Sequence, residues 1–105
     1  MIEIKRWDNG KVIFEANVST VKEAVELAVK QKVSLAYANL IGADLAGANL
    51  IGADLAGAEL RWAYLVGAHL QGADLFKANI RRVDLRGAKL EGADLTNADI
   101  RWADF

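Results

Sequence analysis

The chain has 105 residues and a formal net charge of −1, and its composition is 53% hydrophobic and 26% charged. This length suits one domain, and a nearly neutral charge does not favour a nucleic-acid or membrane-surface partner. The absence of cysteine excludes disulfides and thiolate metal sites, and no apolar run approaches the roughly 20 residues of a membrane span. Residues 1–11 carry charges where a signal peptide needs an apolar run, so a cytoplasmic location is expected.

Residues 1–18 are expected to form a β-hairpin that turns at residues 8–10. A two-residue loop would pair Ile4 with Glu15, whereas a three-residue loop with a left-handed Gly10 pairs Ile4 with Phe14. We favour the second register because it pairs apolar residues with each other. It leaves Trp7 and Ile13 partly covered. The buried face of the hairpin then consists of Ile2, Ile4, Val12, Phe14 and Ala16.

A helix is expected next, from Thr20 to about Lys32. Thr20 is a favourable N-cap, and Glu23 stands three residues later, where its carboxylate can complete a capping box. Apolar residues recur at helical spacing and predict one buried stripe. That stripe consists of Val21, Ala24, Val25, Leu27, Ala28 and Val29.

From residue 33 to residue 105 a five-residue pattern, A-D/N-L-x-x, recurs without interruption. A helix would scatter leucines of this spacing around its circumference, and a flat strand would place successive leucines on opposite faces. All the leucines can share one interior only if the chain turns a corner in every unit, so that four units close a coil of about twenty residues. The stacked coils predict four interior columns. They are Leu35, Leu55, Leu75 and Leu95; Leu40, Leu60, Ile80 and Ile100; Leu45, Leu65, Leu85 and Phe105; and Leu50, Leu70 and Leu90.

This tandem A(D/N)LXX pattern resembles the pentapeptide repeat family. The resemblance implies an all-β solenoid, namely a right-handed quadrilateral β-helix, over residues 33–105. A bare first coil would expose an apolar end and unpaired strand edges, so residues 1–32 are expected to form a hairpin-and-helix cap. Cap and β-helix then make one structural domain. Because leucine columns fill the interior, we expect no cavity for a cofactor.

The residue two places after each central leucine lies at a corner where a positive φ favours glycine. Two corner columns are glycine throughout, whereas the columns that begin at Tyr37 and at Gly42 are mixed and are expected mostly to avoid the type II turn. The Asp or Asn before each central leucine is expected to bond nearby backbone, since both residue types serve there. His69 shares that slot without a second histidine nearby, so no metal site and no catalytic residue are expected.

One corner departs from the repeat by collecting arginine and tryptophan. A coil spacing of about 4.8 Å would place Arg82 between Trp62 and Trp102, where cation–π contacts contribute roughly 0.5–1 kcal/mol. Such a ladder could only rigidify the corner, or it could form an interface, since Trp and Arg are common interface anchors. An acidic protein segment or a phosphate-bearing ligand would suit it. The candidate partner-binding residues are Arg61, Trp62, Arg81, Arg82, Arg101 and Trp102.

Three classes of function remain open. A non-catalytic scaffold or protein-interaction module agrees best with a filled interior and the Arg/Trp surface. The resemblance supplies an alternative, since some pentapeptide repeat proteins mimic DNA, bind DNA gyrase and confer fluoroquinolone resistance; this chain is shorter and its repeats are less acidic. An enzyme is disfavoured because no nucleophile, base and orienting group come together. Direct nucleic-acid binding would show a steep dependence on salt.

The C-terminal end of the solenoid has no predicted cover. Phe105 belongs to an interior column, so its ring would face water beside an unpaired strand edge. A two-fold partner that presents the same end would close this surface without growing into fibres, so a homodimer is expected. The candidate dimer interface consists of Phe105, Ile100 and Trp102.

Overall fold

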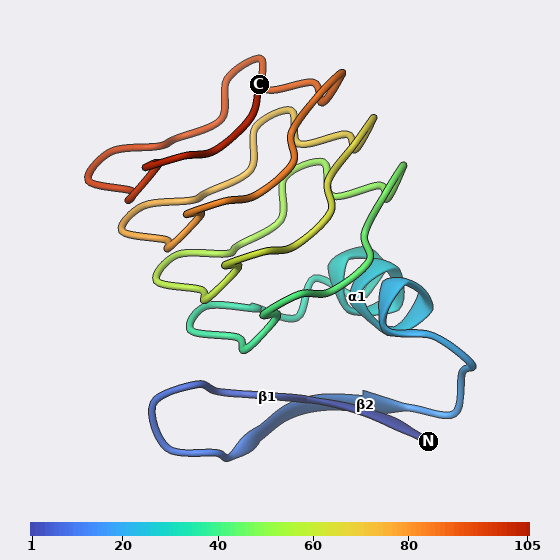
Figure 1. The fold of residues 1–105 in the computed structure, drawn as a ribbon. Coiled ribbons are helices and arrows are strands. Elements are labelled where there is room, and N and C mark those ends of the chain that lie inside the picture. The colour runs from blue at the N-terminus through green and yellow to red at the C-terminus, as the bar shows by residue number, and fades with distance from the viewer.

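The computed structural model describes residues 1–105 and contains three regular elements. These are strand β1 (Ile2–Lys5), strand β2 (Val12–Ala16) and helix α1 (Val21–Lys30). The remaining chain winds upward into stacked coils, with the hairpin and α1 next to the first coil (Figure 1). No helix is long and apolar enough to cross a membrane.

The hairpin has the expected register at its base, where Ile4 lies opposite Phe14. The register then shifts, because Lys5 lies opposite Val12 and leaves Ile13 as the extra residue of a bulge. The expectation that Val12 is buried is therefore wrong. The bulge reverses the alternation, so Val12 is 45% exposed while Ile13 packs against the core.

The bulge also lengthens the hairpin loop. The amide of Arg6 donates to the carbonyl of Lys11 at 2.9 Å, which leaves residues 7–10 as the loop instead of the expected three residues. Gly10 is left-handed as expected, with a φ of 74°.

Helix α1 begins as expected and ends earlier than expected. The Thr20 hydroxyl accepts the amide of Glu23 at 3.1 Å and donates to the Glu23 carboxylate, whereas the expected capping box has the carboxylate accept the Thr20 amide. Lys32 adopts a φ of 60°, and its amide and that of Val33 donate to the last turn of the helix. This left-handed C-terminal motif stops α1 at Lys30.

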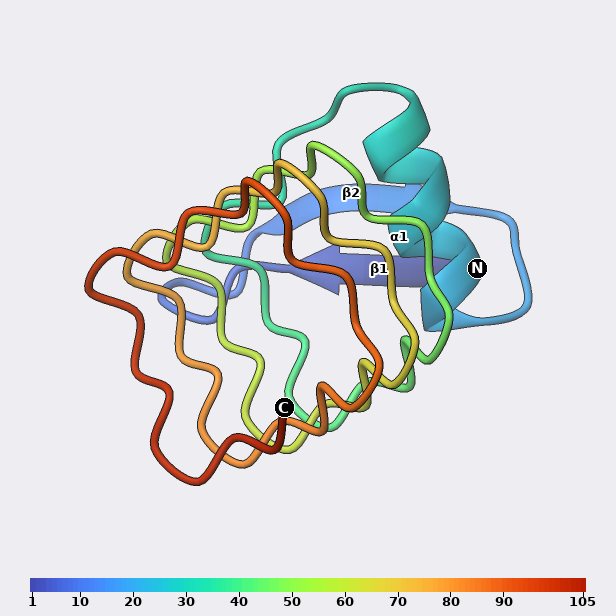
Figure 2. The same cartoon turned by 90° about the horizontal axis from the view of Figure 1, so that it is seen from above.

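The repeat forms four-sided coils that stack one above another, as the view from above shows (Figure 2). Parallel bridges join residues 20 positions apart, such as Asn39 with Glu59 and Asp44 with Tyr64. Amides of central leucines donate to the next coil, as in the bond of 2.8 Å from Leu65 to Asp84. The expected coil length is confirmed.

Leucine, isoleucine and alanine fill the interior of the coils. Every central residue from Leu35 to Leu85 is at most 3% exposed, and no polar or charged residue is buried. The last coil is different, because Leu90 and Leu95 are half-buried and Ile100 is 47% exposed. The core therefore runs from the hairpin side to the third coil and opens at the C-terminal end.

Hairpin and helix cover the first coil. Arg6 bridges to Ala38 antiparallel, and the amide of Asn39 donates to the carbonyl of Lys5 at 2.7 Å. Main-chain bonds of the hairpin thus satisfy one side of the first coil's edge, around residues 37–39. Side chains from both elements join the leucine core. They are Ile4 from β1 and Ala24, Val25 and Ala28 from α1.

The expectation that two corner columns avoid the type II conformation is wrong. Trp62 has a φ of 64°, and its corner is closed by a bond of 2.9 Å from the Ala63 amide to the Leu60 carbonyl. Each corner must have the same shape for the coils to stack, so this requirement overrides a cost of roughly 1–2 kcal/mol per left-handed residue. The six non-glycine corner residues with positive φ are Tyr37, Trp62, Lys77, Arg82, Asn97 and Trp102.

Candidate functional site

The Arg/Trp corner comprises Arg61, Trp62, Arg81, Arg82, Arg101 and Trp102, and stacking brings all six side chains to one edge of the solenoid. The Arg82 guanidinium carbon lies 5.2 Å from the ring centroid of Trp62 and 5.0 Å from that of Trp102. Arg101 lies 5.7 Å from the Trp102 ring. Arg82 therefore occupies the expected position between two indoles, within cation–π distance of both.

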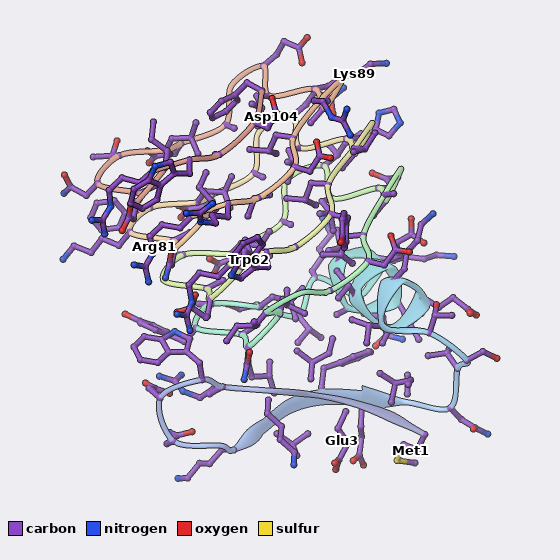
Figure 3. All side chains as sticks on the ribbon, in the orientation of Figure 1. Met1, Glu3, Trp62, Arg81, Lys89 and Asp104 are labelled. Carbon is purple, nitrogen blue, oxygen red and sulfur yellow. The ribbon has the colours of Figure 1, made fainter.

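Three of the six residues, Trp62, Arg82 and Trp102, have a positive φ, and all three are exposed. Trp62 is 58% exposed and Trp102 is 65% exposed, so the rings that flank Arg82 remain accessible. Trp62 and Arg81 lie on neighbouring coils (Figure 3). The edge offers large apolar surfaces that alternate with positive charge.

Three of the four arginines at this corner have acidic neighbours. Arg61 pairs with Glu59 at 2.9 Å, and Arg101 pairs with Asp99 at 2.7 Å. Arg81 lies 3.6 Å from the same Asp99 carboxylate. The hydrogen bond from Arg101 is the main cause that lowers the pKa of Asp99 to about 2, and the charge of Arg81 adds to it.

Arg82 has no carboxylate partner, so its charge is balanced only by the two indole faces. The hollow beside it has a volume of about 130 Å³ and is lined by Arg61, Trp62, Arg81, Arg82 and Trp102. This is well below the roughly 300–1,000 Å³ of pockets that enclose a small molecule. The corner is a contact surface rather than an enclosed site.

Sequence reasoning missed a second cluster of aromatic side chains at the neighbouring corner. Trp7 extends from the hairpin loop, and its indole nitrogen donates to the carbonyl of Gly57 at 2.7 Å. The Tyr37 ring lies over Gly57 so closely that an added Cβ would be 2.7 Å from it. A hollow of about 290 Å³ results. It is lined by Trp7, Tyr37, Ala56, Gly57, Phe76 and Lys77, and we call it the aromatic notch.

The largest hollow on the surface, about 860 Å³, is an open groove between α1 and the neighbouring coils. Four of its polar residues already bond to each other in pairs, since Ser34 donates to the Asp54 carboxylate at 2.7 Å and Glu26 accepts the backbone amide of Asn49 at 2.8 Å. Aromatic side chains are absent from its lining. The groove therefore offers less to a partner than the two aromatic corners.

Most of the Asp and Asn residues that precede a central leucine bond to backbone, as expected, whereas Glu59 at the same position accepts from Arg61. Asp44 accepts a hydrogen bond from the amide of Ala46 at 3.2 Å. The same bond, donated by the amide two positions later to the Asp or Asn side chain, recurs along the chain. His69 stands at the same repeat position, directly before a central leucine, and is half-buried. No group of three or more His, Asp or Glu side chains is placed to hold a metal ion. The slot residues with this bond are Asn39, Asp44, Asn49, Asp54, Asp74, Asn79, Asp84, Asp94 and Asp99.

The residues of the candidate dimer interface lie on the open last coil. Phe105 is 58% exposed and Ile100 is 47% exposed, although both belong to interior columns. Trp102 lies between them in sequence and belongs to the Arg/Trp corner as well. Pairing of two chains through this end stays a prediction.

Comparisons with known proteins agree with this architecture. The family model described as pentapeptide repeats matches in eight copies over residues 34–72, 53–92 and 73–105. A pentapeptide repeat protein from Nostoc PCC 7120 is 37% identical with a TM-score of 0.69, covering 85% of this chain and 78% of that one. No curated protein sequence matches the chain significantly.

Two further solved structures are similar over part of their length. A pentapeptide repeat protein from the Arabidopsis thaliana thylakoid lumen is 38% identical with a TM-score of 0.61, covering 62% of this chain and 45% of that one. The pentapeptide repeat protein Rfr23 from the cyanobacterium Cyanothece 51142 is 34% identical with a TM-score of 0.53, covering 63% and 52%. This chain therefore spans about half the length of these two relatives.

Proposed function

Since the chain belongs to the pentapeptide repeat family, we propose that it is a non-catalytic interaction module that binds an acidic segment of another protein through the Arg/Trp corner. One observation carries the proposal: Arg82 is exposed between two indole rings and has no carboxylate partner. An acidic side chain of a partner protein would supply the missing countercharge.

The geometry of Arg82 favours binding over a purely structural role. Stacking between Trp62 and Trp102 orders the guanidinium before a partner arrives, which reduces the entropy lost on association. The exposed edges of both rings can then be buried together with the ion pair. Tryptophan and arginine are among the residue types enriched at the positions that dominate binding energy in protein interfaces.

Two features support the non-catalytic part of the proposal. The interior is filled with apolar side chains, so it has no room for a substrate. The aspartates of the repeat accept backbone amides, as Asp54 does from Ala56 at 3.2 Å, which leaves them poorly placed to act as paired acid and base. We also propose that the protein is cytoplasmic, because it has no cysteine and therefore no disulfides of the kind common in secreted proteins. Fractionation of source cells would test this location.

The alternative of a DNA mimic that binds gyrase has no observation in its favour. A mimic needs a continuous acidic surface, and here Asp99 and Glu59 are engaged by arginines. The solved relatives reported above carry no description as gyrase inhibitors. A gyrase supercoiling assay with the purified protein would test this alternative directly.

The test of the proposal compares Arg82→Ala with the matched control Arg86→Ala. Arg86 lies on another face and pairs with Asp84 at 2.7 Å. Binding is titrated first with a labelled oligoglutamate peptide and then with acidic proteins captured from a lysate of the source organism. For a captured partner, Arg82→Ala should weaken binding by about 2 kcal/mol or more, while Arg86→Ala leaves it unchanged.

Thermal melting of the same variants separates binding from stability. Two exposed cation–π contacts contribute roughly 0.5–1 kcal/mol each, so Arg82→Ala should shift Tm only modestly. If Arg82→Ala lowers stability strongly and leaves every binding constant unchanged, the corner is a structural ladder and the proposal is wrong.

A further inference from the structure

The aromatic notch exists because one coil lacks side chains that its neighbours have. At this corner the first coil carries Tyr37 and the third carries Phe76 and Lys77, whereas the coil between them carries Ala56 and Gly57. The gap is one coil high, about 4.8 Å between strands. Trp7 from the hairpin loop lies at its other side, so three aromatic rings surround a floor of small residues.

The rings of the notch are held in place and remain partly exposed, although Arg6 lies over the Tyr37 ring at 4.7 Å and Lys77 lies over the Phe76 ring at 5.4 Å. The indole of Trp7 is bonded to the Gly57 carbonyl, and the ring of Tyr37 packs on Gly57 from the coil below. Even so, Trp7 is 49% exposed, Tyr37 is 42% exposed and Phe76 is 37% exposed. An ordered apolar hollow without a cover is suited to receive an apolar group from outside.

Positive charge connects the notch with the Arg/Trp corner. Lys77 lines the notch, and Arg82 occupies the equivalent position of the next corner in the same coil. Neither side chain forms an ion pair, whereas Arg6 near the notch is neutralised by Asp8 at 2.8 Å. Lys77 and Arg82 are five positions apart, so their Cα atoms lie at most about 18 Å apart, a span that a short extended peptide can bridge.

We propose that the aromatic notch receives one large apolar side chain from the same acidic segment that binds Arg82. The inference rests on the proposed function and specifies the partner: an extended segment with an apolar anchor at one end and carboxylates that reach Lys77 and Arg82. A volume of about 290 Å³ suits a single side chain. Burial of one such side chain strengthens binding roughly tenfold to a hundredfold.

The decisive variant fills the notch without altering the backbone. Ala56→Phe places phenylalanine at a position where the repeat already accepts it, because Phe76 occupies the equivalent position one coil later. The matched control is Thr96→Phe, the same residue type at the equivalent position on the far side of Phe76. Circular dichroism and melting curves of both variants check that each is folded like the wild type.

The probe is a displayed library of random short peptides selected on the wild-type protein. Enriched peptides should combine a large apolar residue with an acidic cluster, and their affinity should fall at least tenfold with Ala56→Phe and remain unchanged with Thr96→Phe. Replacing the apolar residue of such a peptide by serine should produce the same loss.

Other outcomes separate the two proposals. Acidic peptides that lose binding with Arg82→Ala and keep it with Ala56→Phe would leave the proposed function intact and overturn the notch. Enrichment without acidic residues, or no enrichment, would overturn both proposals. A random-sequence oligonucleotide that binds with the same sensitivity to Ala56→Phe would make the notch a base-stacking site and would also overturn the inference.

Discussion

Replacing Leu65 by alanine would leave a void in the middle of an interior column. Leu65 is 1% exposed and lies between Leu45 and Leu85 of the adjacent coils. The coils cannot close around the void, because bonds of 2.8–2.9 Å run from Leu65 to the coil above and from Leu45 to the coil of Leu65. We therefore expect a loss in the middle to upper part of the usual range for buried leucines, about 3–4 kcal/mol of unfolding free energy.

Urea denaturation followed by circular dichroism measures this loss, and thermal melting should show a Tm lower by about 12–25 °C for a domain of this size. The matched control is Leu95→Ala, since Leu95 is half-buried at the open end and should lose only about 1–2 kcal/mol. Equal losses at Leu65 and Leu95, or a loss below about 1 kcal/mol at Leu65, would refute the close-packed interior.

Three further predictions concern charge, corners and assembly. The folded-state pKa of Asp99 is about 2, below its usual value, so the carboxylate stabilises the fold at neutral pH and this contribution disappears as the pH falls from about 5 towards 2. Asp99→Asn should therefore flatten the curve of Tm against pH between these values, and a curve that stays as in the wild type would contradict this. Gly67 has a φ of 68° and open space around it, so Gly67→Ala should cost about 1 kcal/mol by backbone strain alone, whereas Val66→Ala at the preceding corner position should change stability less in the same melts. We propose that two chains pair through the end of the solenoid where Phe105 is exposed. Light scattering across a concentration series should show self-association of the wild type that Phe105→Asp weakens. A wild type that stays monomeric at every concentration would rule this out.

Local sequence rules located the N-terminal elements and failed at their ends. Pairing of Ile4 with Phe14 followed from apolar partners, and the start of α1 followed from the Thr20 cap. The bulge at Ile13 and the left-handed Lys32 were missed. Lysine has no preference for a positive φ, and no residue at the bulge marks the extra position in the sequence.

The five-residue period by itself determined the solenoid, the leucine columns and the stacking of Arg82 between Trp62 and Trp102. Leucines spaced by five can share one interior only in a four-sided coil, and that coil sets which residues lie above one another. Only the tertiary structure decided the conformation of the corners and the existence of the aromatic notch. Stacking imposes one shape on every corner regardless of its residue, and Trp7 reaches Gly57, 50 positions away, only because the hairpin docks on the first coil.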